Sequence, residues 1–182
     1  MTESHELHRR RRKPLEPFFS RAGIGRMEGM IKEEATLLND RLEALQGSDT
    51  VVRLDHIFSA FAGDMMARHI EESKRENVGA KKYDESASNS IFRYIVTSDM
   101  PASEQSTERL SREAMVLFGA GTATTARTMG FVCFYLLTNP HMKQRLSDEL
   151  APLMADYPHN LPKWSDLEKL PYLQAVITEG LR

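Results

Sequence analysis

The sequence contains one cysteine, Cys133, so no disulfide bond can form within the chain and a reducing compartment fits. No apolar run approaches the roughly 20 residues needed to cross a bilayer. The most apolar stretch, residues 131–137, is followed by Asn139-Pro140, which ends it. The N-terminal residues up to Lys13 are polar and charged and lack the apolar core of a signal peptide. As written, the chain is therefore expected to be cytoplasmic.

Charge of one sign is not in excess either. The 24 Lys and Arg residues against 26 Asp and Glu give a net charge of −2, which offers no reason to expect a nucleic-acid partner. The histidines are not grouped with cysteine or acidic residues as zinc ligands are, so no metal site is predicted. The sequence also lacks a Gly-rich phosphate loop and a serine-nucleophile elbow.

What the sequence does contain is helical periodicity over most of its length, which predicts an all-α fold. The expected helices cover residues 5–20, 22–46, 56–71, 90–98, 104–138 and 139–154, and a last one runs from residue 171 to the end. Gly47 should end the second helix, and Asn139 and Pro140 should begin the sixth as N-cap and first residue. The β-branched residues 50–54 could form a short strand, and the polar residues 73–90 are the best linker candidate.

Residues 120–125 (AGTATT) place poor helix formers inside the longest apolar helical stretch. Glycine costs about 1 kcal/mol relative to alanine inside a helix, so this segment indicates a close approach to the backbone. The Thr124 hydroxyl can return to the carbonyl of Ala120, beside Gly121. Two interpretations remain open: a groove where a hydroxyl serves a small polar ligand, or a close helix–helix crossing. Spacing alone favours the crossing.

Three further features have an ordinary and a functional interpretation. His8 and Arg12 share a helix face and could clamp an anion, although a solvated basic face or a nuclear-localisation patch explains the run at 9–13 more simply. Glu179 and Arg182 can pair, as exposed residues three apart commonly do. Cys133 lies in apolar surroundings and is expected to be a small core residue.

Taken in order, these segments resemble the cytochrome P450 family of haem-thiolate monooxygenases, in the form found in filamentous-fungal secondary metabolism. The matching segments are His8 with Arg12 through Phe19, residues 120–125, Asn139-Pro140 with Leu146 and Glu149-Leu150, residues 170–173, and Glu179 with Arg182. The resemblance covers about residues 5–72 and 90–182. It implies the helical part of the cytochrome P450 fold, without most of its sheets.

The resemblance also implies a role for each matching residue. His8 and Arg12 correspond to the residues that bind a haem propionate, while Ala120 and Gly121 correspond to the dioxygen groove. Thr124 corresponds to the residue that delivers protons as the O–O bond breaks. Glu179 and Arg182 resemble a buried structural pair. Haem is the implied cofactor, a NADPH-cytochrome reductase and a small lipophilic substrate are the implied partners, and full-length relatives are anchored in the endoplasmic-reticulum membrane.

The sequence departs from the family pattern at several points. Ala123 stands where an acidic residue usually precedes the threonine, so proton relay would be impaired or left to water. Pro14 follows Arg12 closely and would strain a continuous helix. Residues 73–90 stand where the family has its substrate-covering helices, so we interpret them as a deletion junction within one partial domain of residues 1–182.

The largest departure concerns the iron ligand. The sequence as written has no membrane anchor and ends at Arg182, before the loop that carries the family's cysteine thiolate. Cys133 lies about two and a half turns past Thr124 on the distal helix and cannot replace it. This argues against haem binding by the chain alone, and we expect a truncated relative that is inactive as written. The alternatives are a non-enzymatic helical binding or regulatory protein of a biosynthetic cluster, and a protein that uses residues 8–13 to bind an acidic partner.

Overall fold

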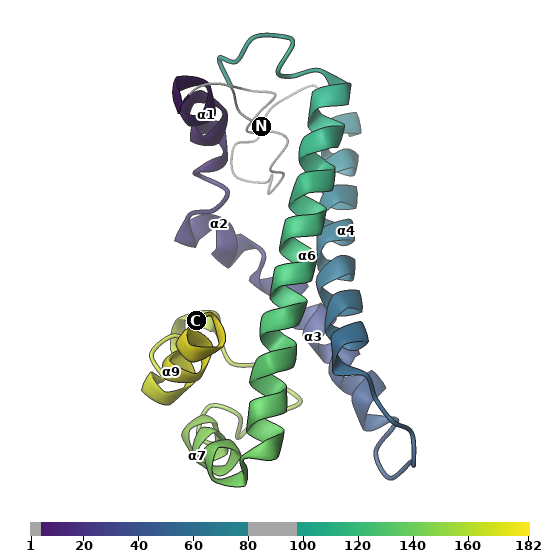
Figure 1. Ribbon diagram of the computed structural model, residues 1–182, viewed down its shortest axis with the longest axis vertical. Coiled ribbons are helices and arrows are strands. Elements are labelled where there is room, and N and C mark those ends of the chain that lie inside the picture. The colour runs from purple at the N-terminus through teal and green to yellow at the C-terminus, as the bar shows by residue number, and fades with distance from the viewer. Residues whose placement is uncertain (1–4, 80–97) are drawn as a thin grey trace. The chain divides into compact units, whose positions relative to one another are not determined.

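The computed structural model describes residues 5–79 and 98–182, and every regular element in these two ranges is a helix, which confirms the all-α prediction. The elements are α1 (His5–Arg12), the 3₁₀ helix η1 (Lys13–Leu15), α2 (Arg21–Arg26), α3 (Glu28–Glu43), α4 (Leu54–Gly79), α6 (Thr107–Thr138), α7 (Pro140–Leu150), α8 (Trp164–Leu167) and α9 (Pro171–Gly180) (Figure 1).

The N-terminal helix is shorter than the predicted range 5–20. Its α-helical part, α1, ends at Arg12, and the chain continues as η1 with Pro14 in the first turn. A proline is tolerated there because the N–H groups of a first turn have no helical partner. The strain expected for a continuous helix through Pro14 therefore does not arise.

Three further predictions in this half differ from the structure. The predicted helix 22–46 is divided into α2 and α3 at Met27. The prediction that Gly47 ends the helix is not met, since α3 already ends at Glu43 and residues 44–47 form a turn. Gly47 has a φ of 78° in that turn, a left-handed conformation that glycine adopts without penalty. The strand considered for residues 50–54 is wrong: residues 50–53 are irregular and Leu54 begins α4.

Helix α4 is longer than predicted. It continues to Gly79, so residues 73–79 are helical although their polar composition suggested a linker. Residues 80–97 lie outside the described part of the chain. The rest of the proposed junction therefore lies outside it, and so does the predicted helix 90–98 except for Ser98.

Predictions for the C-terminal half are largely confirmed. Helices α6, α7 and α9 lie within the predicted ranges, and Pro140 and Pro171 each occupy the start of a helix. Asn139 is the N-cap residue of α7, as predicted, and its carbonyl accepts from the N–H of Lys143 at 3.1 Å. Its side chain makes no capping bond to α7, because its amide donates instead to the carbonyl of Tyr135 in α6 at 2.8 Å. The turn expected around residues 165–167 is the short helix α8.

The chain divides into two compact units, and α3, α4 and α6 contribute to both. The first unit comprises Met1–Met30 and Gly63–Gly121, and the second comprises Ile31–Ala62 and Thr122–Arg182. Buried side chains in the first unit include Phe18, Met30, His69 and Met100, and those in the second include Phe58, Ala62 and Ala126. In the first unit the rings of Phe18 and His69 lie 4.9 Å apart.

Much apolar surface stays exposed on the helices of both units. Met115 is 76% exposed and Val116 is 64% exposed on α6 in the first unit, and Leu137 on α6 and Leu181 just after α9 are exposed in the second. Contiguous exposed apolar surface commonly marks a face that other elements or partners cover.

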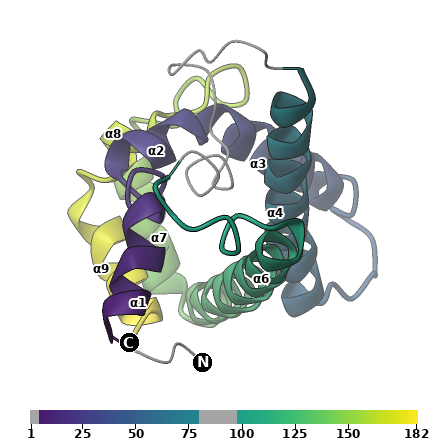
Figure 2. The same cartoon turned by 90° about the horizontal axis from the view of Figure 1, so that it is seen from above.

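Within the second unit, Glu149 joins α7 to α9, which lie side by side (Figures 1 and 2). Its carboxylate accepts hydrogen bonds from the backbone N–H groups of Tyr172 at 2.9 Å and Leu173 at 2.8 Å. These are two of the N–H groups that the start of a helix leaves without a partner, and negative charge is favourable at that end. The guanidinium of Arg145 also lies 4.2 Å from the centre of the Tyr172 ring.

We predict that Glu149→Gln lowers the free energy of unfolding by about 1–2 kcal/mol, because an amide retains one acceptor and loses the charge. Chemical denaturation followed by circular dichroism measures this change. Asp148→Asn on the same helix is the matched control: Asp148 is exposed and accepts from Gln144, one turn away, so its loss should cost no more than about 0.5 kcal/mol. Equal effects of the two substitutions would contradict the capping role.

Candidate functional site

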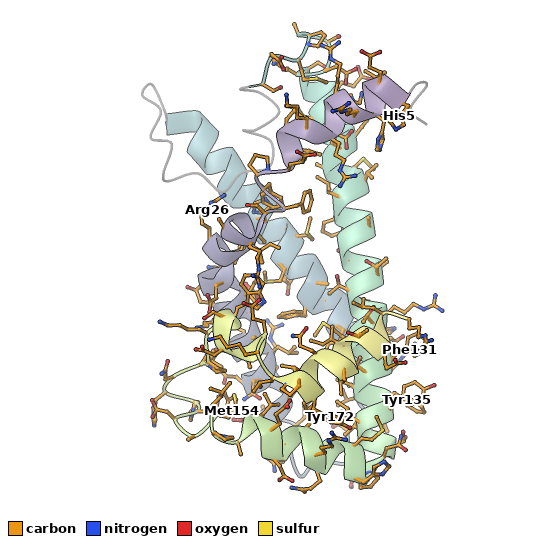
Figure 3. The ribbon with its side chains drawn as sticks, turned by 90° about the vertical axis from the view of Figure 1, so that its left-hand side faces the viewer. His5, Arg26, Phe131, Tyr135, Met154 and Tyr172 are labelled. Carbon is orange, nitrogen blue, oxygen red and sulfur yellow. The ribbon has the colours of Figure 1, made fainter. Side chains whose placement is uncertain are left out.

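His8 and Arg12 line the same hollow of about 370 Å³ in the first unit. The residues that line the hollow come from α1, from η1, from the segment that precedes α6 and from the first part of α6. Figure 3 shows α1 beside this end of α6. The other lining residues are Arg11, Pro14, Leu15, Met100, Glu104, Arg109, Glu113 and Val116. The structure therefore brings the two predicted anion-binding residues together at a concave surface.

The cationic groups in this hollow differ in their partners. Arg11 forms a two-bond ion pair with Glu104, in which Nε donates to Oε2 at 2.9 Å and Nη2 donates to Oε1 at 2.5 Å. Arg109 donates to Glu104 at 3.2 Å and also pairs with Glu113. The side chains of Arg12 and His8 are exposed and have no hydrogen bond or ion pair to any residue that the structure describes.

Glu104 is held as a carboxylate. The hydrogen bond from Arg11, supported by the one from Arg109, keeps the pKa of Glu104 below its usual value of 4.5, although burial acts in the opposite direction. The acidic side chains of Glu104 and Glu113 face the three arginines of the hollow, and Arg11 and Arg109 pair with them. The remaining positive charge belongs to Arg12, beside His8, which is suited to binding a small carboxylate or phosphate group.

The central segment, residues 120–125, has a packing role at Gly121. A Cβ atom at this position would lie 3.3 Å from Sδ of Met66 on α4, closer than most side chains approach. Gly121 therefore allows α4 to lie close to α6, as the helix-crossing interpretation predicts for this residue. Ala120 and Thr124 are exposed, and neither Ala120 nor Gly121 lines the hollow that contains His8.

Glu179 and Arg182 form an ion pair at 3.4 Å, as their spacing predicts. Their side chains are 68% and 80% exposed, whereas the resemblance implied a buried pair. Both line a groove of about 910 Å³ in the second unit, between α6 and the helices α7 and α9, and Thr124 also lines it. Phe131 and Tyr135 on α6 and Tyr172 on α9 contribute to its walls (Figure 3).

Two contacts near the predicted residues were not predicted from the sequence. Gly180, between Glu179 and Leu181, lies against Val132 of α6, where a Cβ atom would overlap the valine side chain. Arg11, one of the residues in the basic run at 9–13, makes the ion pair that joins α1 to Glu104. The glycine next to Glu179 was a usable signal for the first contact. No local signal indicates the second, because 93 residues separate its partners.

Cys133 is half-buried on α6, and burial raises the pKa of its thiol. That shift disfavours the thiolate form, which is the form that binds metals. Within the described ranges, no group of three or more His, Cys, Asp or Glu residues is placed to hold a metal ion. In the same part of the chain, no helix combines the length and apolar character needed to cross a bilayer.

Comparison with known proteins gives a consistent result. The family model described as cytochrome P450 matches residues 60–182. The cytochrome P450 monooxygenase tndB of Aspergillus flavipes is 48% identical in an alignment that covers all of this chain and 56% of that protein. Stellatic acid synthase of Emericella variicolor is 38% identical with 43% of its length covered, and fusicoccadiene C-8 hydroxylase of Phomopsis amygdali is 34% identical with 49% covered. The chain thus spans about half the length of the curated relatives it matches.

We predict that Gly121→Leu lowers the free energy of unfolding by about 1–3 kcal/mol, because the new side chain overpacks the contact with Met66. Gly119→Leu is the matched control, since a Cβ atom at Gly119 has open space around it. A double-mutant cycle with Met66→Ala should recover part of the loss at Gly121 and none at Gly119. If leucine is tolerated equally at both glycines, the crossing at Gly121 is not a packing constraint.

Proposed function

The chain belongs to the cytochrome P450 family, and from this we propose that its residues form the propionate-binding and dioxygen-facing part of a haem-thiolate monooxygenase. Haem is the cofactor of full-length members, and when bound it supplies the activation of dioxygen. The proposed reaction of the whole protein is the oxidation of a lipophilic secondary metabolite with electrons from a NADPH-cytochrome reductase. The name of one relative, fusicoccadiene C-8 hydroxylase, supports hydroxylation as the type of reaction.

The hollow that contains His8 and Arg12 carries this proposal. A haem propionate is a carboxylate, and charge-assisted hydrogen bonds from a guanidinium are the strong way to hold one. Arg12 and His8 lie on one helix face, and their polar groups are not engaged by other described residues. The two neighbouring arginines, Arg11 and Arg109, are already paired with Glu104. The chain's residues therefore fit the carboxylate end of the cofactor.

In the described part of the chain, no residue is suited to act as the thiolate ligand of the haem iron. Cys133 is half-buried, with a raised thiol pKa, whereas the family chemistry requires a thiolate. No step at the iron is therefore assigned to these residues. We propose that the 182-residue polypeptide does not activate dioxygen by itself.

Thr124 is proposed to present its hydroxyl as a proton donor beside the place that haem would occupy in the whole protein, and Ala120 and Gly121 would leave room beside the backbone. Its exposed position on α6 and its place at the wall of the 910 Å³ groove support access to its hydroxyl. Ala123 supplies no carboxyl group next to it, so the relay would depend on water. Glu179 and Arg182 are proposed to act as a structural pair.

The length of the alignments supports an internal deletion in this chain. The alignment with the Aspergillus flavipes monooxygenase extends over 269 positions while the chain has 182 residues, so at least 87 positions have no counterpart here. We propose residues 73–90 as the junction, because they are polar and lie between the two segments that resemble the family. A second candidate function, a non-enzymatic helical binding protein of a biosynthetic cluster, is favoured by the exposed apolar side chains of α6.

We predict that Arg12→Gln weakens the binding of haem to the purified chain about tenfold or more, which corresponds to the loss of one charge-assisted hydrogen bond. Absorbance titration with haem measures the change. Arg10→Gln removes the same charge from the same helix at an exposed position that does not line the hollow, and should change the affinity less than about twofold. Equal weakening by both variants would show that only the overall charge of α1 matters.

We further predict that the reduced, carbon monoxide-treated chain lacks the red-shifted Soret band that thiolate ligation produces. The reason is that burial raises the pKa of the Cys133 thiol and so disfavours its thiolate form. The difference spectrum of wild type and of Cys133→Ser should then be the same. A thiolate-type band in the wild type that disappears in Cys133→Ser would overturn the proposed inactivity.

A further inference from the structure

We propose that Glu104 positions His8 and Arg12 for the carboxylates of the cofactor by holding Arg11, and this inference rests on the propionate-binding function proposed above. Glu104 itself lies in the short segment between Met100 and α6 and belongs to a different part of the sequence from α1. Its proposed role is to set the orientation of α1 relative to the hollow, within the first unit.

The geometry of the ion pair sets the rotation of α1. Two nearly parallel hydrogen bonds, at 2.9 and 2.5 Å, fix both the position and the plane of the Arg11 guanidinium on the Glu104 carboxylate. Viewed along an ideal helix, His8 and Arg12 follow Arg11 by about 60° and 100° in the same direction. Holding Arg11 against Glu104 therefore places both residues on the flank of α1 that lines the hollow.

The segment that carries Glu104 is itself held firmly. The backbone N–H of Glu104 donates to the carbonyl of Pro101 at 2.8 Å. The side-chain amide of Gln105 donates to the carbonyls of Ser98 at 2.9 Å and Met100 at 3.1 Å, and the Met100 side chain is buried. Glu104 thus presents its carboxylate from a backbone with little freedom, as a positioning residue must.

Burial makes this pair stronger than an ordinary surface pair. The side chains of Arg11 and Glu104 are 28% and 16% exposed, whereas those of Arg112 and Glu108 in a neighbouring pair are 69% and 77% exposed. Exposed pairs contribute little because water and salt screen them, and partly buried two-bond pairs are screened less. Glu108 therefore supplies a matched control of the same residue type on the same stretch of chain.

Positioning and simple charge attraction predict opposite effects of Glu104→Gln on the binding of an anion. Glu104→Gln makes the hollow more positive, so charge alone predicts tighter binding of an anion. Positioning predicts the opposite, because the two-bond contact of Arg11 with the Glu104 carboxylate no longer sets the rotation of α1. The double variant Arg11→Gln/Glu104→Gln restores the net charge of the wild type without restoring that contact.

The test is a fluorescence titration of the full 182-residue chain with protoporphyrin IX and, separately, with its dimethyl ester, which lacks free carboxylates. The wild type is expected to prefer the diacid. Glu104→Gln and the double variant should each lose about tenfold of that preference, a change of about 1.4 kcal/mol, with the affinity for the ester unchanged. Glu108→Gln should keep the preference, and Glu104→Asp should recover part of it.

Each other result has a definite meaning. If the wild type binds diacid and ester equally, the propionate function fails and the role of Glu104 fails with it. If the wild type prefers the diacid and Glu104→Gln prefers it equally or more strongly, only the positioning role is overturned. Recovery of the preference in the double variant would overturn it as well, because charge balance would then explain the effect.

Discussion

Close approach to α6 is the constraint on which the packing of both units depends. In the first unit, α4 brings Met66 against α6 at Gly121, and in the second unit α9 brings Gly180 against Val132. In each contact glycine relieves crowding: a Cβ atom at Gly180 would overlap the side chain of Val132, and one at Gly121 would lie 3.3 Å from Sδ of Met66. Most helical stability in proteins comes from such packing rather than from intrinsic propensity. The cost of glycine within a helix is therefore offset at these two positions by contact with the next helix.

The sequence was sufficient where the determining signal is local. Proline at a first helical position marked the starts of α7 and α9, and glycine marked the turn at Gly47. It was insufficient where a helix boundary depends on its surroundings. The break at Met27 lies between Gly25 and Gly29, but glycines also occur inside α6 without ending it. Helix α4 likewise extends through residues whose polarity suggested a linker. Polar composition lowers the expectation of burial, but it does not prevent an exposed helix from continuing.

The candidate site shows the same division. The spacing of His8 and Arg12 placed them correctly on one face, and the structure puts both at one hollow. The spacing of Glu179 and Arg182 likewise predicted their ion pair, but burial is not encoded in spacing, and the pair is exposed. The contact between Arg11 and Glu104 was invisible for a related reason: it joins residues 93 positions apart, and nothing in the basic run distinguishes Arg11 from its neighbours.

These differences bear on how the two ends of a haem are recognised. A carboxylate needs cations that are held in place and left unpaired, and the hollow satisfies this by pairing Arg11 and Arg109 internally while Arg12 remains available. An iron ligand needs a thiol whose anion is stabilised, and the apolar surroundings of Cys133 do the reverse. Both requirements call for a positively charged environment, which the arginines of the hollow supply and the apolar surroundings of Cys133 do not. An arrangement of cations at one place therefore carries no implication for a thiol elsewhere, and the proposed recognition of a propionate can be tested separately from catalysis.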